Sequence, residues 1–77
     1  MKITLESLLQ DISEILEENK INKKSNFKRF KNWDSLSILS IIMLTQSKYK
    51  VNLSNEEITK SKNTEGLYKI IEKKIKK

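Results

Sequence analysis

The shortage of turn-forming residues constrains the fold of this chain most. Its 77 residues include one glycine, Gly66, and no proline. A β-sheet domain of this size needs several tight turns, and these depend on glycine and proline for their backbone angles. Apolar residues instead recur at the spacing of helix turns along most of the sequence. We therefore predict a single all-α domain over residues 1–77, near the lower size limit for a self-sufficient core.

The first predicted helix covers residues 4–18, and Thr4 is a candidate N-cap. Its apolar residues follow the i, i+3, i+4, i+7 pattern: Leu5, Leu8, Leu9, Ile12, Ile15 and Leu16. The pattern spans only about two heptads, and the polar side of the helix is acidic. These features favour packing inside one bundle over a coiled coil or a helix on a membrane surface.

The helical pattern fails over residues 19–33, which we interpret as a long surface loop with one turn near residues 27–30. A loop of this length is unusual in a small domain. Ile21, Phe27 and Phe30 are the apolar residues that would anchor it to the core. The alternative is a partly disordered linker, because the segment is rich in charge.

A second helix is predicted to begin at Ser35 and to run to about Lys48. Asp34 is a good N-cap, and Trp33 and Ile38 have the spacing of a hydrophobic staple. Ser35 then occupies the first helical position. The free backbone amides and the positive dipole end of a helix favour a phosphate there. A phosphodiester group attached to Ser35 would therefore be held by the helix.

The residues of this second helix divide into two faces. Leu39 and Ile42, with help from Ile38 and Thr45, are predicted to point into the core. A separate stripe begins beside Ser35 and consists of Leu36, Ser40, Met43 and Ser47. The apolar members of this stripe, Leu36 and Met43, are either an exposed contact surface or simply more core.

Two further helices complete the prediction. Residues 54–57 have the sequence of a capping box, with Leu53 and Ile58 spaced as its staple, and the short helix ends within residues 60–63. Asn63 or Thr64 caps the last helix. Its apolar stripe consists of Leu67, Ile70, Ile71 and Ile75.

Several kinds of chemistry are excluded by composition. The chain contains no cysteine and no histidine, so disulfides, a cysteine nucleophile, a Ser-His pair and the usual zinc sites are absent. The ten Asp and Glu residues lack the spacing of a metal-binding loop. No apolar segment reaches the roughly 18 residues of a membrane span, and no signal peptide is recognisable. We therefore expect a cytoplasmic protein that is not an enzyme.

The tripeptide Asp34-Ser35-Leu36 resembles the prosthetic-group site of the acyl carrier protein family, since an aromatic residue precedes it and Ile, Leu and Met follow at helical spacing. The order of helices also resembles that family over nearly all 77 residues. The resemblance implies a small four-helix bundle with a long first loop and a short third helix. It also implies that 4′-phosphopantetheine from coenzyme A is attached to Ser35, next to Asp34 and Leu36.

The resemblance further implies a function as a carrier. The thiol of the prosthetic group would hold an acyl or aminoacyl group as a thioester and present it to partner enzymes. The expected partners are a phosphopantetheinyl transferase and the enzymes that load and transfer the acyl group, and the expected state is a monomer. The partner-docking face of the family corresponds here to Leu36, Ser40, Met43 and Ser47.

One departure from the family concerns charge. Carriers of fatty acid synthesis usually have an acidic second helix, whereas residues 35–54 of this chain contain no acid. Attraction to a basic enzyme surface requires complementary charge. We therefore predict a free-standing carrier of one specialised pathway, and its acyl group and pathway stay open. The Trp before Asp34 and the Leu-Ser-Ile-Ile sequence at residues 39–42 are also similar to such carriers.

The competing hypothesis is a small basic helical binding protein without a prosthetic group. The net charge is +6, and residues 19–33 contain six cations and no acid. Phe27 and Phe30 lie among these cations, as on surfaces that bind single-stranded nucleic acid. Specific nucleic-acid sites rely strongly on arginine, however, and Arg29 is the one arginine among 16 cations. We therefore expect no nucleic-acid partner.

Overall fold

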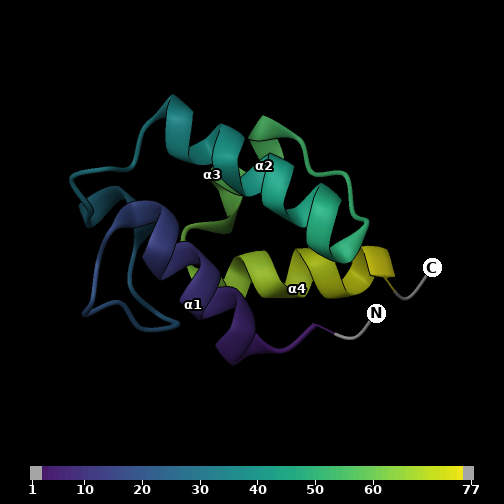
Figure 1. Ribbon diagram of the computed structural model, residues 1–77, viewed down its shortest axis with the longest axis horizontal. Helices are drawn as coiled ribbons and strands as arrows, with labels where there is room; N and C mark the ends of the chain where they lie inside the picture. The colour runs from purple at the N-terminus through teal and green to yellow at the C-terminus, as the bar shows by residue number, and fades with distance from the viewer. Residues whose placement is uncertain (1–2, 76–77) are drawn as a thin grey trace.

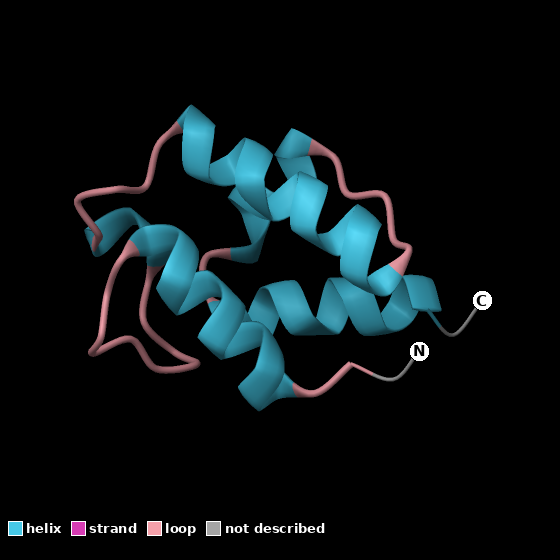
Figure 2. Ribbon diagram, in the orientation of Figure 1, coloured by secondary structure: helices cyan, strands magenta, loops and turns pink. Residues whose placement is uncertain are grey.

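The helices of the computed structural model agree with the all-α prediction. The structure describes residues 3–75, and within this range it contains no strand (Figure 2). Its elements are α1 (Leu5–Leu16), the short 3-10 helix η1 (Phe27–Arg29), α2 (Ser35–Tyr49), α3 (Asn55–Ser61) and α4 (Thr64–Ile75). α4 packs against α1 and α3, and α2 packs against α1 and α3 (Figure 1). The long first loop and the short third helix are both present.

Helix α1 is shorter than predicted because its last turn closes early. Thr4 Oγ1 accepts a hydrogen bond from the Ser7 amide at 3.1 Å, which confirms Thr4 as the N-cap. At the other end Glu17 adopts the left-handed conformation, with φ of 55°. The Glu18 amide then donates back to the Ser13 carbonyl at 3.0 Å. This arrangement ends the helix at Leu16, two residues before the predicted end.

The loop of residues 19–33 packs on the bundle. Phe27 is buried, and Ile21 and Phe30 are half-buried against the core, which confirms the three predicted anchors. The backbone also holds the loop, because the Phe27 amide donates to the Lys62 carbonyl at 2.8 Å. The Glu65 amide donates to the Lys23 carbonyl at 3.0 Å. The loop is therefore a packed part of the fold and not a linker.

The prediction for the buried face of α2 is wrong for Leu39. Leu39 was assigned to the core, but 51% of its surface is exposed. Ile42 and Ile38 are half-buried, whereas Ile41 and Thr45 are fully buried. The helix is therefore rotated so that the face centred on Ile41 points inward.

Two polar residues share the buried face of α2 with Ile41. Ser37 and Thr45 lie one turn before and one turn after Ile41. Both hydroxyls are hydrogen-bonded, so burying them costs little. Ser37 Oγ donates to the Asp34 carbonyl at 2.8 Å, and Thr45 Oγ1 donates to the Ile41 carbonyl at 3.0 Å.

The starts of α3 and α4 agree with the capping residues predicted from the sequence. The Ser54 hydroxyl accepts from the Glu57 amide, and the Glu57 carboxylate accepts from the Ser54 amide, which completes the predicted capping box. The Ser54 amide also lowers the pKa of Glu57 below its usual value. Asn63 Oδ1 accepts from the Gly66 amide at 2.8 Å and so caps α4.

One core joins the four helices and the loop. Its buried hydrophobic side chains are Ile3, Leu8, Ile12, Leu16, Phe27, Ile41, Tyr49, Val51, Leu53, Ile58, Leu67 and Ile71. Both members of the predicted α3 staple, Leu53 and Ile58, are among them. The core is mostly aliphatic, and the start of α2 is fixed against it.

Candidate functional site

The start of α2 is built by a reciprocal cap between Asp34 and Ser37. Asp34 Oδ1 accepts from the Ser37 amide at 3.0 Å, which confirms the predicted N-cap. In return, Ser37 Oγ accepts from the Asp34 amide at 2.9 Å. This capping box was not predicted, because Ser37 stands where glutamate or glutamine is usual. The Asp-x-x-Ser spacing was the available signal.

The segment before the cap is held in place by aromatic stacking and by Asn32. The rings of Trp33 and Phe27 stack with their centroids 4.6 Å apart. Trp33 and Ile38 are both half-buried against the core, as the predicted staple requires. Asn32 Nδ2 donates to the Leu16 carbonyl at 2.8 Å and ties the segment to the end of α1. The stacking of Trp33 on Phe27 and the hydrogen bond from Asn32 thus both fix the position of the first turn of α2.

Ser35 lies at the first position of α2 and is exposed to solvent. The hydrogen bonds at this helix start, within the described residues, join Asp34 to Ser37 and the Ile38 amide to the Asp34 carbonyl, and none uses the Ser35 hydroxyl. An open depression lies beside it, lined in part by Asn32, Leu36 and Ser40. Its hydroxyl is therefore accessible to another enzyme. A phosphodiester there would lie at the positive end of the α2 dipole, so the residues present fit the group.

The predicted stripe on α2 is exposed along its whole length. Leu36 and Met43 are 72% and 61% exposed, and Ser40 and Ser47 are also exposed. Leu36 and Met43 are therefore not core residues. The misassigned Leu39 adds to this surface, so large apolar side chains line the outer face of α2 from the turn that contains Ser35.

The part of α2 from Leu36 to Ser47 carries no charged side chain. Lys48 is the one charged residue of the helix, and it lies in the last turn. Its Nζ contacts Asp11 Oδ2 at 3.0 Å, and this hydrogen bond raises the pKa of Lys48. Asp11 also accepts from the Tyr49 hydroxyl at 3.2 Å. Lys48 is thus occupied in joining α2 to α1. The charges nearest Ser35 are the carboxylates of Asp34 and Glu17, which line the depression beside it.

Other kinds of site find no support in the described part of the chain. Residues 3–75 contain no group of acidic residues that could hold a metal ion. No helix in the same range has both the length and the hydrophobicity needed to cross a bilayer.

The cap of α2 provides a direct prediction. Replacing Asp34 with alanine should lower the free energy of unfolding by about 0.5–2 kcal/mol, because the Ser37 amide loses its acceptor. Asp34→Asn is the matched control, since asparagine is an equally good N-cap, and it should stay near the wild type. Urea denaturation followed by circular dichroism measures both variants. Equal stability of the two variants would show that the Asp34 carboxylate does not cap the helix.

Comparison with protein-family models and with curated proteins found no match. Among solved structures, the chain is similar to the solution NMR structure of a holo-acyl carrier protein from Geobacter metallireducens. The sequences are 24% identical, the match covers 95% of this chain and 86% of that chain, and the TM-score is 0.76. This likeness establishes the fold, which is the bundle predicted from the sequence.

Proposed function

We propose that this chain is a carrier protein that holds an acyl or aminoacyl group as a thioester on 4′-phosphopantetheine attached to Ser35. The observation that carries the proposal is the exposed Ser35 hydroxyl at the first position of a capped helix, in a chain with the fold of a holo-acyl carrier protein. The prosthetic group supplies the thiol that the cysteine-free sequence lacks. The carrier itself is not an enzyme, because catalysis belongs to its partners.

The residues of the chain would each have a simple part in this function. Ser35 Oγ forms the phosphodiester, and the free amides of the first turn of α2 stabilise its charge. Asp34 and Ser37 keep this turn formed through their reciprocal hydrogen bonds. Leu36 lies next to the attachment point and is the most exposed of the three exposed large hydrophobic residues, all of which lie on α2. It would contact the enzyme that approaches Ser35.

The partners would be a phosphopantetheinyl transferase and the enzymes that load and transfer the acyl group. The stripe of Leu36, Ser40, Met43 and Ser47 would be their docking face, with Leu39 as an additional contact. Because this face lacks acids, we assign the chain to a specialised pathway rather than to general fatty acid synthesis. It would act as a free-standing monomer in the cytoplasm.

Modification at Ser35 tests the proposal. Incubation with coenzyme A and a broad-specificity phosphopantetheinyl transferase should add one prosthetic group to the wild type and none to Ser35→Ala. Ser54→Ala is the matched control, because Ser54 is also an exposed serine but lies outside the docking face, and it should be modified like the wild type. Intact-mass spectrometry measures all three. A wild type that gains no group, or a Ser35→Ala variant that gains one, would overturn the proposal.

The packing of the loop aromatics argues against the competing function of nucleic-acid binding. Bases stack on exposed aromatic rings in single-strand sites. Here Phe27 is 1% exposed and its ring stacks on Trp33 inside the fold. Phe30 is half-buried against the core. The loop therefore presents its cations around one half-buried ring, Phe30, and no fully exposed ring.

A further inference from the structure

The loop of residues 19–33 concentrates positive charge next to the modification site. We call its cations the basic loop: Lys20, Lys23, Lys24, Lys28, Arg29 and Lys31. All six side chains are exposed. The ion pairs that residues 3–75 form involve Lys48, Lys60 and Lys74, and none includes a cation of the basic loop. Its charge is therefore not neutralised within the described part of the chain.

The cations are held in a fixed arrangement by the fold. Phe27 anchors the loop in the core, and its amide is bonded to the Lys62 carbonyl. The Asn26 side chain caps η1 by accepting from the Lys28 amide at 3.0 Å. Like charges on an ordered segment repel one another, which disfavours this arrangement in the isolated chain. A partner of opposite charge would remove that repulsion without first having to order the loop.

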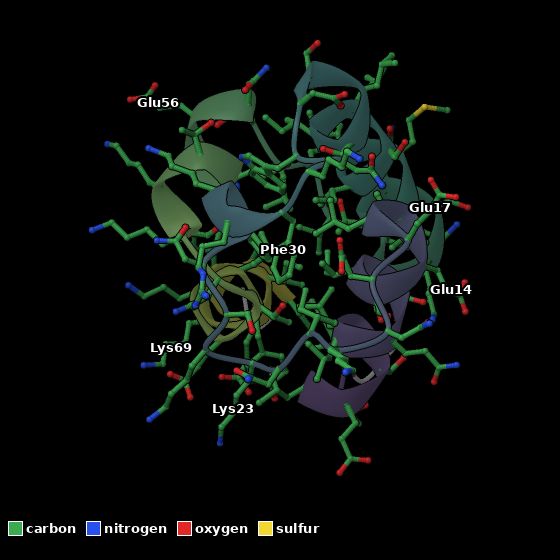
Figure 3. All side chains as sticks on the ribbon, turned by 90° about the vertical axis from the view of Figure 1, so that its left-hand side faces the viewer. Glu14, Glu17, Lys23, Phe30, Glu56 and Lys69 are labelled. Carbon is green, nitrogen blue, oxygen red and sulfur yellow. The ribbon has the colours of Figure 1, made fainter. Side chains whose placement is uncertain are left out.

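The neighbouring helices extend the same surface. The bond between the Glu65 amide and the Lys23 carbonyl brings the loop against the first turn of α4. In the end-on view, Lys23 and Lys69 project on one side of the molecule, and Glu14 and Glu17 lie on the other (Figure 3). Lys23 of the loop and Lys69 of α4 therefore lie on the side opposite Glu14 and Glu17, although α4 also carries Glu65 and Glu72. Glu56 lies nearer the basic side but pairs with Lys60 at 3.5 Å.

A hollow in the loop offers a place for a single anionic group. It is lined by Lys20, Asn22, Ser25, Arg29 and Phe30. The guanidinium of Arg29 and the ammonium of Lys20 are the donors that a carboxylate accepts from most strongly. The hollow is therefore suited to an acidic side chain that projects from a protein surface.

We propose that the basic loop docks an acidic surface on the enzymes that act at Ser35. Lys31 stands four residues before Ser35, and the loop lies at the end of the molecule where α2 begins (Figure 1). An enzyme that acts at Ser35 from this end of the molecule can therefore contact the loop as well as α2. The basic loop supplies long-range attraction that the uncharged face of α2 lacks. That the partner is an enzyme acting at Ser35 rests on the proposed function. That the basic loop binds acidic protein surfaces does not depend on it.

An acidic protein surface suits the basic loop better than two other polyanions. Nucleic acid would find no fully exposed ring among the cations, because Phe27 is buried and Phe30 is half-buried. A lipid surface would lack an apolar anchor among the cations, because the large exposed hydrophobic residues of the described chain, Leu36, Leu39 and Met43, all belong to α2. Lysine and arginine around a polar hollow instead match carboxylates.

NMR titration with an oligoglutamate peptide of about twelve residues tests the surface at low salt. Amide shifts should concentrate in residues 20–31. The double variant Lys28→Glu with Arg29→Glu should bind at least about tenfold more weakly, because two attractive charges become repulsive. The control, Lys50→Glu with Lys73→Glu, has the same net charge but changes exposed lysines outside the loop, and it should bind like the wild type. Shifts spread evenly over all lysines, or equal weakening in both variants, would overturn the proposal.

Two further measurements separate the alternatives. Oligothymidylate and phosphatidylglycerol vesicles serve as competitors, and tighter binding of either at the loop would overturn the acidic-protein assignment. Each double variant is also compared with the wild type by circular dichroism, and an unchanged helical spectrum shows that loss of peptide binding reflects charge. The initial rate of modification by the transferase and coenzyme A should fall in Lys28→Glu with Arg29→Glu and stay near the wild-type rate in the control. If the wild type itself is not modified, the proposed function is overturned. The peptide titration then still decides whether the basic loop binds acidic surfaces.

Discussion

Replacing Ile41 with alanine should lower the free energy of unfolding by about 2–5 kcal/mol. Ile41 is fully buried at the centre of the inner face of α2, so truncation leaves a cavity in the core. A domain of this size has a total stability of only about 4–12 kcal/mol at ordinary values per residue. The variant should therefore be partly unfolded already at low urea, as circular dichroism would show.

The matched control for Ile41 lies two residues earlier in the same helix. Leu39→Ala should change the free energy of unfolding by less than about 0.5 kcal/mol, because the side chain is half exposed. Both variants lose an aliphatic side chain from α2, so helix propensity affects them similarly. If Leu39→Ala were the more damaging of the two, α2 would be rotated as its sequence pattern predicted, and the observed face would be wrong.

The helix starts were predictable from the sequence because caps are local. Thr4, Asp34, Ser54 and Asn63 each accept a hydrogen bond from the amide three residues ahead, so a short stretch of chain contains the whole interaction. The position of Ser35 at the first residue of α2 follows from the same local pattern. For this reason the candidate site could be identified before any tertiary contact was known.

The orientation of α2 was not predictable in the same way. The helix has apolar residues on almost every side, so hydrophobic spacing does not select one face. The buried face also includes Ser37, whose hydroxyl satisfies its hydrogen bonds with Asp34. Such burial depends on partner atoms, and a periodicity argument does not include them. The prediction for Leu39 failed for this reason.

Contacts between distant segments around the site were also missed. The Asn32 side chain donates a hydrogen bond to the Leu16 carbonyl, 16 residues earlier in the chain. The Glu65 amide donates to the Lys23 carbonyl, 42 residues earlier. Asn32 and Lys23 are polar loop residues with no distinctive pattern in the sequence. Their roles follow only from the way the loop returns to the bundle.

Gly66 is the residue whose role changes most between sequence and structure. In the sequence it is a weak position in the last helix, since glycine is a poor helix former. In the structure it lies where α4 passes close to the end of α3. A Cβ atom at this position would come within 2.2 Å of the Ser61 carbonyl oxygen. That oxygen belongs to the backbone and accepts from the Asn63 amide at 2.7 Å, so it cannot move alone.

Gly66→Ala should therefore destabilise the domain by about 1–3 kcal/mol or more, because the joint between α3 and α4 must open to admit the methyl group. In an exposed helix, by contrast, replacing glycine with alanine raises the free energy of unfolding by about 1 kcal/mol. The strain should spread to the loop, since the Lys62 carbonyl that holds the Phe27 amide lies in this joint.

Urea denaturation and amide exchange at Phe27 measure the two effects of Gly66→Ala. Lys69→Ala, an exposed site on the same helix, should stay within about 0.5 kcal/mol of the wild type. A stabilised Gly66→Ala variant would show that α3 and α4 are not in close contact at this glycine.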